Sequence, residues 1–142
     1  KAYLANSRGE VQVNQLYRSS STGKVCYLTG NGTRATGWKQ VGKDWYYFDT
    51  KTGIARSGWI QSSGKWYYMD SSGAMKTDCQ FIRGKWYYMN KSGVMQTGWQ
   101  LIYGKWYYMD KSGAMKTDWQ LISGKWYYMD NSGAMKTGWI LL

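Results

Sequence analysis

Tryptophan and tyrosine are the residues of this sequence whose type and spacing could support chemistry. The chain holds 10 Trp and 14 Tyr but only two Phe among its 142 residues. A Trp-Tyr-Tyr motif recurs at an interval of 21 residues once and 20 thereafter, beginning at Trp45, Trp66, Trp86, Trp106 and Trp126. A second Trp series keeps the same period, with Cys79 in the missing place: Trp38, Trp59, Trp99, Trp119 and Trp139. Two aromatic series in one register predict a site that recurs along the chain.

Clustered Trp and Tyr rings suit a weakly hydrated cation. The ring faces carry a negative quadrupole, so a quaternary ammonium binds between several rings without any hydrogen-bond donor. One desolvated contact is worth about 2 kcal/mol at best, and several weak sites on one chain add avidity. The periodicity alone leaves three interpretations open: a quaternary ammonium, a sugar, or an inter-repeat core without a ligand. For the second Tyr of each motif, the core is the favoured interpretation.

The rest of the inventory argues against catalysis and metal binding. The chain has no His and eight acidic residues, and no pair of carboxylates stands in a distinctive motif. Because His is the usual general base and metal ligand, we expect no enzyme, no metal site and no cofactor. Cys26 and Cys79 match no CxxC spacing. We expect them to be small buried hydrophobes and not a disulfide pair.

The net charge of +11 predicts attraction to a polyanion. Nucleic acid, anionic lipid and phosphate-containing wall polymers all qualify, but the Lys residues recur singly and form no block. Single-strand binders place aromatic rings along a basic groove, whereas these rings recur at a fixed interval between units, so no nucleic acid is expected. No apolar run approaches the 18 or so residues of a membrane helix, so no direct membrane insertion is expected.

Short strands and tight turns must position the rings, because the chain has 18 Gly and no Pro. In one unit, an apolar stretch from Gly58 leads into a turn at Ser62-Ser63-Gly64 and then Lys-Trp-Tyr-Tyr-Met, which is typical of a β-hairpin. A lone hairpin is marginal in water. Neighbouring hairpins must therefore stack, which predicts an all-β solenoid of stacked β-hairpins. Alternation along a strand places Trp66 and Tyr68 on one face and Tyr67 on the other.

Three segments are expected along the chain. Residues 1–21 are predicted to be an irregular N-terminal segment, because nothing before about residue 19 aligns with the repeat. Residues 22–36 read as a degenerate repeat, with Val25 where Trp should stand. Residues 37–142 hold five repeats and a terminal half repeat.

The repeat itself is recognisable. The unit GWIQSSGKWYYMDSSGAMKT, residues 58–77, closely resembles the choline-binding repeat, or cell wall-binding repeat, of Gram-positive surface proteins and phage lysins. The resemblance covers residues 37–142 with high specificity and residues 22–36 in degraded form. It implies a left-handed superhelical solenoid of β-hairpins that binds choline between adjacent repeats. It also implies cages that take two Trp from one repeat, a Tyr of the motif from the next, and often a Met. We assign the first Tyr of the motif, because it faces away from its own Trp.

Carried over onto this sequence, the resemblance implies three complete cages. Their walls are Trp38, Trp45, Tyr67 and Met75; Trp59, Trp66, Tyr87 and Met95; and Trp99, Trp106, Tyr127 and Met135. At the remaining junction Cys79 replaces one wall, so the site of Trp86 and Tyr107 is expected to be weak or empty.

The resemblance also implies the partner and the place of action. The expected partner is choline or phosphocholine on teichoic or lipoteichoic acid, at the bacterial cell surface or wall, where phage lysins also act. A homodimer is left open. Two other functions stay open as alternatives: a glucan or carbohydrate-binding repeat module, and the wall-anchoring part of a larger cell-wall hydrolase. The predicted cages hold only Trp, Tyr and Met, which favours an ammonium over a sugar.

Overall fold

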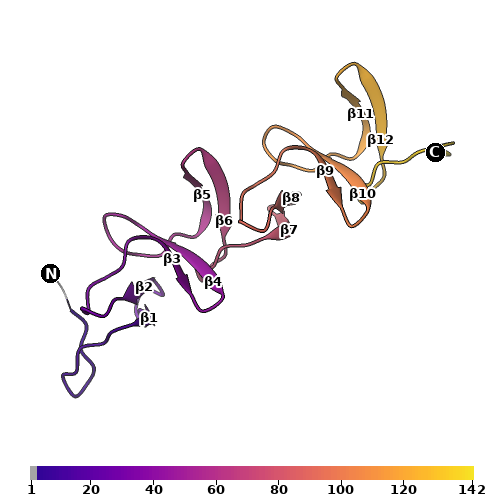
Figure 1. Cartoon of the computed structure of the whole chain (residues 1–142). Helices are drawn as coiled ribbons and strands as arrows, with labels where there is room; N and C mark the ends of the chain where they lie inside the picture. Colours follow the sequence, from indigo (N-terminus) through magenta and orange to yellow (C-terminus); the bar gives the residue numbers. More distant parts are fainter. Residues whose placement is uncertain (1–2) are drawn as a thin grey trace. The chain divides into compact units, whose positions relative to one another are not determined.

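The protein is a succession of two-stranded antiparallel hairpins, described for residues 3–142 in a computed structural model (Figure 1). The strands pair in consecutive couples: β1 (Gln15–Arg18) with β2 (Val25–Leu28), β3 (Gly37–Val41) with β4 (Asp44–Phe48), β5 (Gly58–Ser62) with β6 (Lys65–Met69), β7 (Asp78–Ile82) with β8 (Lys85–Met89), β9 (Gly98–Ile102) with β10 (Lys105–Met109), and β11 (Asp118–Ile122) with β12 (Lys125–Met129). Residues 3–142 contain no helix, and so no helix in this range that could cross a membrane. The prediction of an all-β chain of repeated hairpins is confirmed.

The turns explain why each unit closes as a hairpin. Between β5 and β6 stand only Ser63 and Gly64, with φ of 51° and 76°. Two successive positive φ values define the type I′ turn, whose twist matches that of the flanking strands. Between β3 and β4 the first turn residue is Gly42, with φ of 63°, as a type II′ turn requires.

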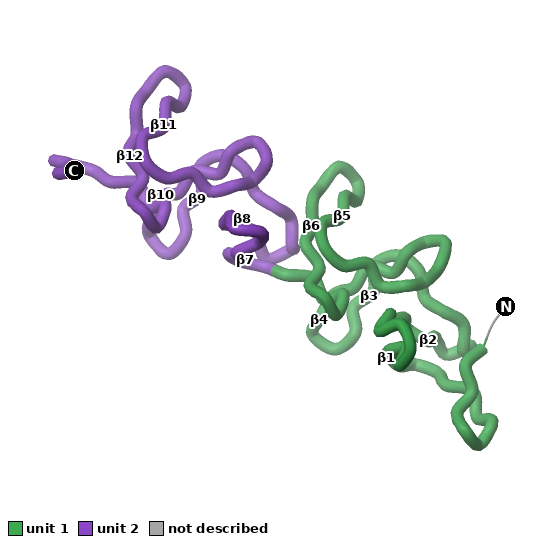
Figure 2. Tube along the Cα trace, turned by 180° about the vertical axis from the view of Figure 1, so that it is seen from behind, with its two compact units in different colours: residues 1–76 green, residues 77–142 purple. Residues whose placement is uncertain are grey.

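The chain divides into two compact units, residues 1–76 and 77–142, coloured separately in Figure 2. The first unit holds the three hairpins from β1 to β6, and the second holds the three from β7 to β12. Each unit therefore contains two junctions between consecutive hairpins, and these junctions are where the predicted cages belong.

Within a unit, the segment that follows each hairpin is hydrogen-bonded to the previous hairpin in the chain. The backbone N–H of Met75 donates to the carbonyl of Trp45, and that of Met135 donates to the carbonyl of Trp106, both at 2.8 Å. Met75 also pairs with Met69 at the end of its own hairpin in an isolated β-bridge. Each connecting segment thus joins two consecutive hairpins, which a lone hairpin needs for stability in water.

Methionine supplies four of the five most deeply buried side chains. The last residue of the second strand is almost completely buried in five hairpins: Phe48, Met69, Met89, Met109 and Met129. A second methionine lies against the loop of the following hairpin, because a Cβ atom added at Gly133 would collide with the thioether of Met115. Gly133 also has φ of 89°, a conformation that glycine adopts without cost.

The N-terminal part is more regular than the sequence indicates. Strand β1 lies inside the segment predicted to be irregular, and it pairs with β2 so that Leu16 opposes Tyr27. A further isolated bridge joins Ala5 and Val11. The residues of β1 are all exposed and carry no Gly-Trp signature, so no sequence signal marked them.

The two cysteines differ in their surroundings. Both thiols are free, and Cys26 is buried as predicted. The prediction that Cys79 is buried is wrong, because this residue is exposed. Partial desolvation and the neighbouring Asp78 carboxylate together raise the pKa of the Cys79 thiol.

Candidate functional site: aromatic cages between hairpins

The second unit contains a cage of the predicted composition. Trp99, Trp106, Tyr127 and Met135 line an open hollow of about 300 Å³, at the small end of the range for small-molecule sites, about 300–1,000 Å³. The ring centroids of Trp99 and Trp106 are 6.4 Å apart at an interplanar angle of 85°, and those of Trp99 and Tyr127 are 4.8 Å apart at 69°. Steeply inclined rings form the corner of a box with no carboxylate or amide in its wall.

Strand pairing explains how these side chains meet. Trp99 opposes Tyr108 and Leu101 opposes Trp106 across β9 and β10. Because alternate residues of a strand share a face, Trp99 and Trp106 project from the same side of their hairpin. Tyr127 projects from the opposite side of β12 to Trp126, toward the preceding hairpin.

The second Tyr of each motif packs within its own hairpin. The ring of Tyr108 lies 5.2 Å from that of Trp99, and that of Tyr128 lies 5.1 Å from that of Trp119. The same edge-on contact joins Trp38 with Tyr47 in the first unit, at 5.1 Å. These tyrosines therefore pack beside the Trp rings, on the same face of the hairpin.

The first unit repeats the arrangement. The rings of Trp38 and Tyr67 are 4.8 Å apart at 64°, and Trp45 lies on the same face of its hairpin as Trp38 by the pairing of β3 with β4. The backbone of Met75 is bonded to that of Trp45. One polar contact is added: the indole Nε1–H of Trp38 donates to Ser62 Oγ at 3.2 Å.

The second predicted cage is divided between the two units. Trp59 and Trp66 belong to the first unit, and Tyr87 and Met95 belong to the second. Within the first unit, Trp59 packs on Tyr68 of its own hairpin with ring centroids 5.1 Å apart. The cage formed by these four residues stays a prediction.

The junction with Cys79 keeps only part of its wall. Met115 N–H donates to the carbonyl of Trp86 at 2.8 Å, so the hairpins meet as they do elsewhere. The ring of Phe81 lies 5.1 Å from that of Trp86. Phe81 opposes Trp86 in the register of β7 and β8, where Cys79 opposes Tyr88. Phe81 therefore covers a different position from the missing Trp, a contact that sequence reasoning missed.

The first junction of the chain is filled by the protein itself. Val25 stands at the position of the motif Trp and Tyr46 at that of the motif's first Tyr, and both are buried. Tyr46 stacks on Phe48 with ring centroids 5.7 Å apart. Burial, with the charges of Asp44 and Asp70, raises the pKa of the Tyr46 hydroxyl. With aliphatic residues in place of Trp, this junction has become hydrophobic core.

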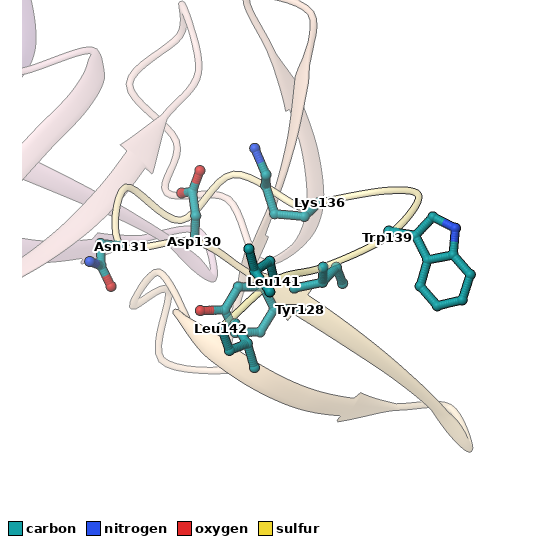
Figure 3. Close-up of a pocket in the computed structure, with 8 residues that line it drawn as sticks. Tyr128, Asp130, Asn131, Lys136, Trp139, Leu141 and Leu142 are labelled. Atoms are coloured by element: carbon teal, nitrogen blue, oxygen red, sulfur yellow. The ribbon is translucent and has the colours of Figure 1, made fainter.

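The last hairpin presents an open half cage. Trp106, which the next hairpin covers in part, is 42% exposed, whereas Trp126 of the last hairpin is 64% exposed. A separate hollow of about 260 Å³ lies nearby, lined by Tyr128, Asp130, Asn131, Lys136, Trp139, Ile140, Leu141 and Leu142. Figure 3 shows the Trp139 ring pointing away from the other lining side chains. Because the Asp130 carboxylate and the Lys136 ammonium both line this hollow, it lacks the uncharged aromatic wall of the cage at Trp99.

One internal contact places an ammonium over an aromatic ring. The Nζ atom of Lys39 lies 4.6 Å from the ring centroid of Tyr27, within the range of a cation–π interaction. By contrast, no group of three or more His, Cys, Asp or Glu side chains suited to a metal occurs among residues 3–142.

Comparison with known proteins identifies the repeat. The model of the choline-binding repeat matches residues 35–79 and 76–118, and that of a cell wall binding repeat matches residues 117–135. No match was found among curated protein sequences.

Several solved structures are similar to this chain. Choline binding protein F from Streptococcus pneumoniae is 41% identical, with a TM-score of 0.81 over 90% of this chain and 43% of that one. CbpJ from Streptococcus pneumoniae is 37% identical, with a TM-score of 0.90 over 99% of this chain and 51% of that one. The modular autolysin LytC from Streptococcus pneumoniae is 28% identical, with a TM-score of 0.65 over 95% of this chain and 36% of that one. This chain thus spans about half the length of these proteins or less.

Proposed function

This chain belongs to the choline-binding repeat family, and from that premise we propose that its aromatic cages bind the choline groups of a bacterial wall polymer. The observation that carries the proposal is the hollow of Trp99, Trp106, Tyr127 and Met135. Its walls offer ring faces and a polarisable thioether, which attract a methylated cation. A sugar site normally adds several polar groups that fix its hydroxyls, and this wall has few.

The charge of the chain fits a phosphate-bearing polymer. Teichoic and lipoteichoic acids combine phosphate groups with choline, so a chain of net charge +11 is drawn to the polymer while the cages hold its substituents. Lys105 and Lys125 are exposed, and each directly precedes the motif Trp of its hairpin. Affinity for the polymer should therefore fall with added salt, while affinity for free choline should change little.

We assign the segment an attaching and non-catalytic role at the cell surface. A longer protein that carries a hydrolase beside these repeats fits the same role, because LytC is described as a modular autolysin. In either case the repeats hold the protein on the wall, and any chemistry lies elsewhere.

The test is a calorimetric titration with choline, with intrinsic Trp fluorescence followed in parallel. The neutral analogue 3,3-dimethylbutan-1-ol, which replaces the ammonium nitrogen with carbon, is the matched ligand control. We expect choline to bind and the neutral analogue to bind much more weakly, because only the cation gains from the ring quadrupoles. No response to millimolar choline, together with retention on dextran, would assign the module to glucan binding instead.

A pair of variants ties the signal to the cage. Trp99→Ala should lower the choline stoichiometry by one site. Trp139→Ala removes the same side chain from a fully exposed position outside the cages and should leave the stoichiometry unchanged. Equal effects of the two substitutions would contradict the cage.

A further inference from the structure

Two cages of the same composition differ in one polar contact. In the first unit, Trp38 Nε1–H donates a hydrogen bond to Ser62 Oγ at 3.2 Å. In the second unit, the residue at the place of Ser62 is Ile122, since each ends the first strand of the hairpin that follows the cage. Ile122 has no hydrogen-bond acceptor in its side chain, so it cannot hold Trp99 in this way.

The contacts between Trp and Tyr rings agree in the two cages. Trp38 lies 4.8 Å from Tyr67, and Trp99 lies 4.8 Å from Tyr127. The supporting contacts with Tyr47 and Tyr108 also agree, at 5.1 and 5.2 Å. The hydroxyl of Ser62 therefore does not change the spacing between the Trp and Tyr rings. Its effect must lie in how firmly the indole is held and in the electron density of the ring.

From this difference we infer that Ser62 is a positioning residue that strengthens cation binding in the cage of Trp38. An indole tied to an acceptor has fewer orientations to lose when the ligand binds, and preorganisation of this kind raises affinity. Donation of the Nε1–H also polarises the indole toward a more electron-rich ring, which favours a cation on its face. The inference rests on the proposed function, because it concerns the affinity of a cage for its ammonium ligand.

The contact joins consecutive hairpins, so it acts where the cage is assembled. Trp38 comes from β3, and Ser62 comes from β5 of the next hairpin, the same hairpin that supplies Tyr67. Both Trp38 and Ser62 are partly buried. Partial burial limits competition from water, which makes this bond more effective than one on an open surface.

The test reads each cage separately in the full chain. Indole ¹⁵N labelling gives one N–H signal per Trp, and Trp38→Phe and Trp99→Phe assign the two signals that matter. Choline is then titrated into wild type, Ser62→Ala, Ser62→Val and Ser62→Thr. Val and Thr have the same shape and differ in the hydroxyl, so this pair isolates the hydrogen bond from packing.

Ser62→Ala and Ser62→Val should raise the choline midpoint at Trp38 by about twofold to tenfold, as the loss of one hydrogen bond implies. The midpoint at Trp99 should stay unchanged in the same samples, and Ser62→Thr should restore both the midpoint and the shifted Trp38 N–H signal. Midpoints at Trp38 that are the same in all four proteins would overturn the inference and leave the proposed function intact. A titration in which choline moves neither Trp38 nor Trp99 would instead refute the proposed function.

Discussion

The ring of Tyr127 lies 4.8 Å from that of Trp99, although Tyr127 belongs to the following hairpin. Its sequence neighbour Tyr128 turns the other way and packs on Trp119 of its own hairpin. Two adjacent tyrosines thus have separate tasks, because consecutive residues of a strand point to opposite faces. Tyr127 closes a cage with the preceding hairpin, and Tyr128 packs against a Trp of its own hairpin.

Substitution of a cage tyrosine should remove one binding site. Tyr127→Ala opens one wall of the hollow at Trp99 and should lower the choline stoichiometry by one, as measured by calorimetry. Tyr107 occupies the same repeat position at the junction that lacks a Trp, so Tyr107→Ala is the matched control and should leave the stoichiometry unchanged. A loss of one site in both variants would mean that the Cys79 junction already binds choline.

Restoring the missing wall should create a site. Cys79→Trp places an indole on the hairpin face that already carries Trp86, opposite Tyr88 as in the other repeats. Tyr107 and Met115 remain available from the next hairpin. The choline stoichiometry of this variant should rise by one, whereas Cys79→Ala should leave it unchanged. An unchanged value in Cys79→Trp would show that our geometry for this junction is wrong.

A methyl group added to the glycine that lies against Met115 should lower the stability of the fold. Gly133→Ala adds the penalty for a left-handed residue, about 1–2 kcal/mol, and a collision with the Met115 side chain, for which overpacking typically costs a further 1–3 kcal/mol or so. Gly124 has φ of 80° but open space around its Cβ position, so Gly124→Ala should show the first penalty alone. Denaturant unfolding measures both.

A double variant separates the two penalties at Gly133. Met115→Ala removes the side chain that the new methyl group would meet. If the collision matters, the destabilisation by Gly133→Ala should be smaller in the Met115→Ala background than in wild type, giving a coupling energy in the double-mutant cycle. Strict additivity would contradict the close contact.

Stability should fall in acid because of the loop aspartates. In Asp130 the hydrogen bonds from Ser132 and Ala134 lower the pKa. In Asp70 and Asp110 burial alone would raise the pKa, but equivalent bonds and a nearby Lys outweigh it and lower the pKa. A carboxylate with a lowered folded pKa stabilises the fold above its unfolded pKa, and this contribution is lost as pH falls through the folded value, from about pH 4 downward.

The chain itself supplies the control for this pH effect. Asn90 occupies the same loop position and accepts the backbone N–H groups of Ser92 and Val94 at 3.0 Å without a titrating group. Replacing Asp70, Asp110 and Asp130 together by Asn should therefore reduce the fall of the melting temperature between about pH 4 and pH 2. The triple variant should melt somewhat lower at pH 7, since a charged acceptor bonds more strongly than an amide. An unchanged acid slope would place the pH sensitivity elsewhere.

The sequence predicts the repeated features well and the unique ones poorly. Trp99, Trp106 and Tyr127 could be assigned to one hollow because the resemblance to the choline-binding repeat implies the kinds of wall residue. The 20-residue period then gives the register, and strand alternation gives the face. The hydrogen bond between Trp38 and Ser62 could not be predicted, because it depends on the distance between side chains of two hairpins. Ser62 is also an exception at its position, which the later hairpins fill with Ile82, Ile102 and Ile122.

The N-terminal hairpin shows the other limit. Strand β1 is short, exposed and without aromatic periodicity apart from Tyr17, so neither propensity nor pattern marked it as a strand. Pairing with β2 makes this segment a strand. Such pairing is a tertiary effect that a propensity scale does not capture.

Because the walls of each cage come from two successive hairpins, the number of binding sites depends on the number of adjacent hairpin pairs and not on the individual hairpin. Duplication of one hairpin repeat in the gene adds a cage without any new kind of contact. Loss of an internal repeat brings two hairpins that were not neighbours into contact, and these can form a cage. Replacement of one Trp, as at the position of Cys79, should remove a single cage and leave its neighbours intact. Avidity for the polymer can thus change by one site at a time as the number of repeats changes, while the fold of every remaining hairpin stays the same.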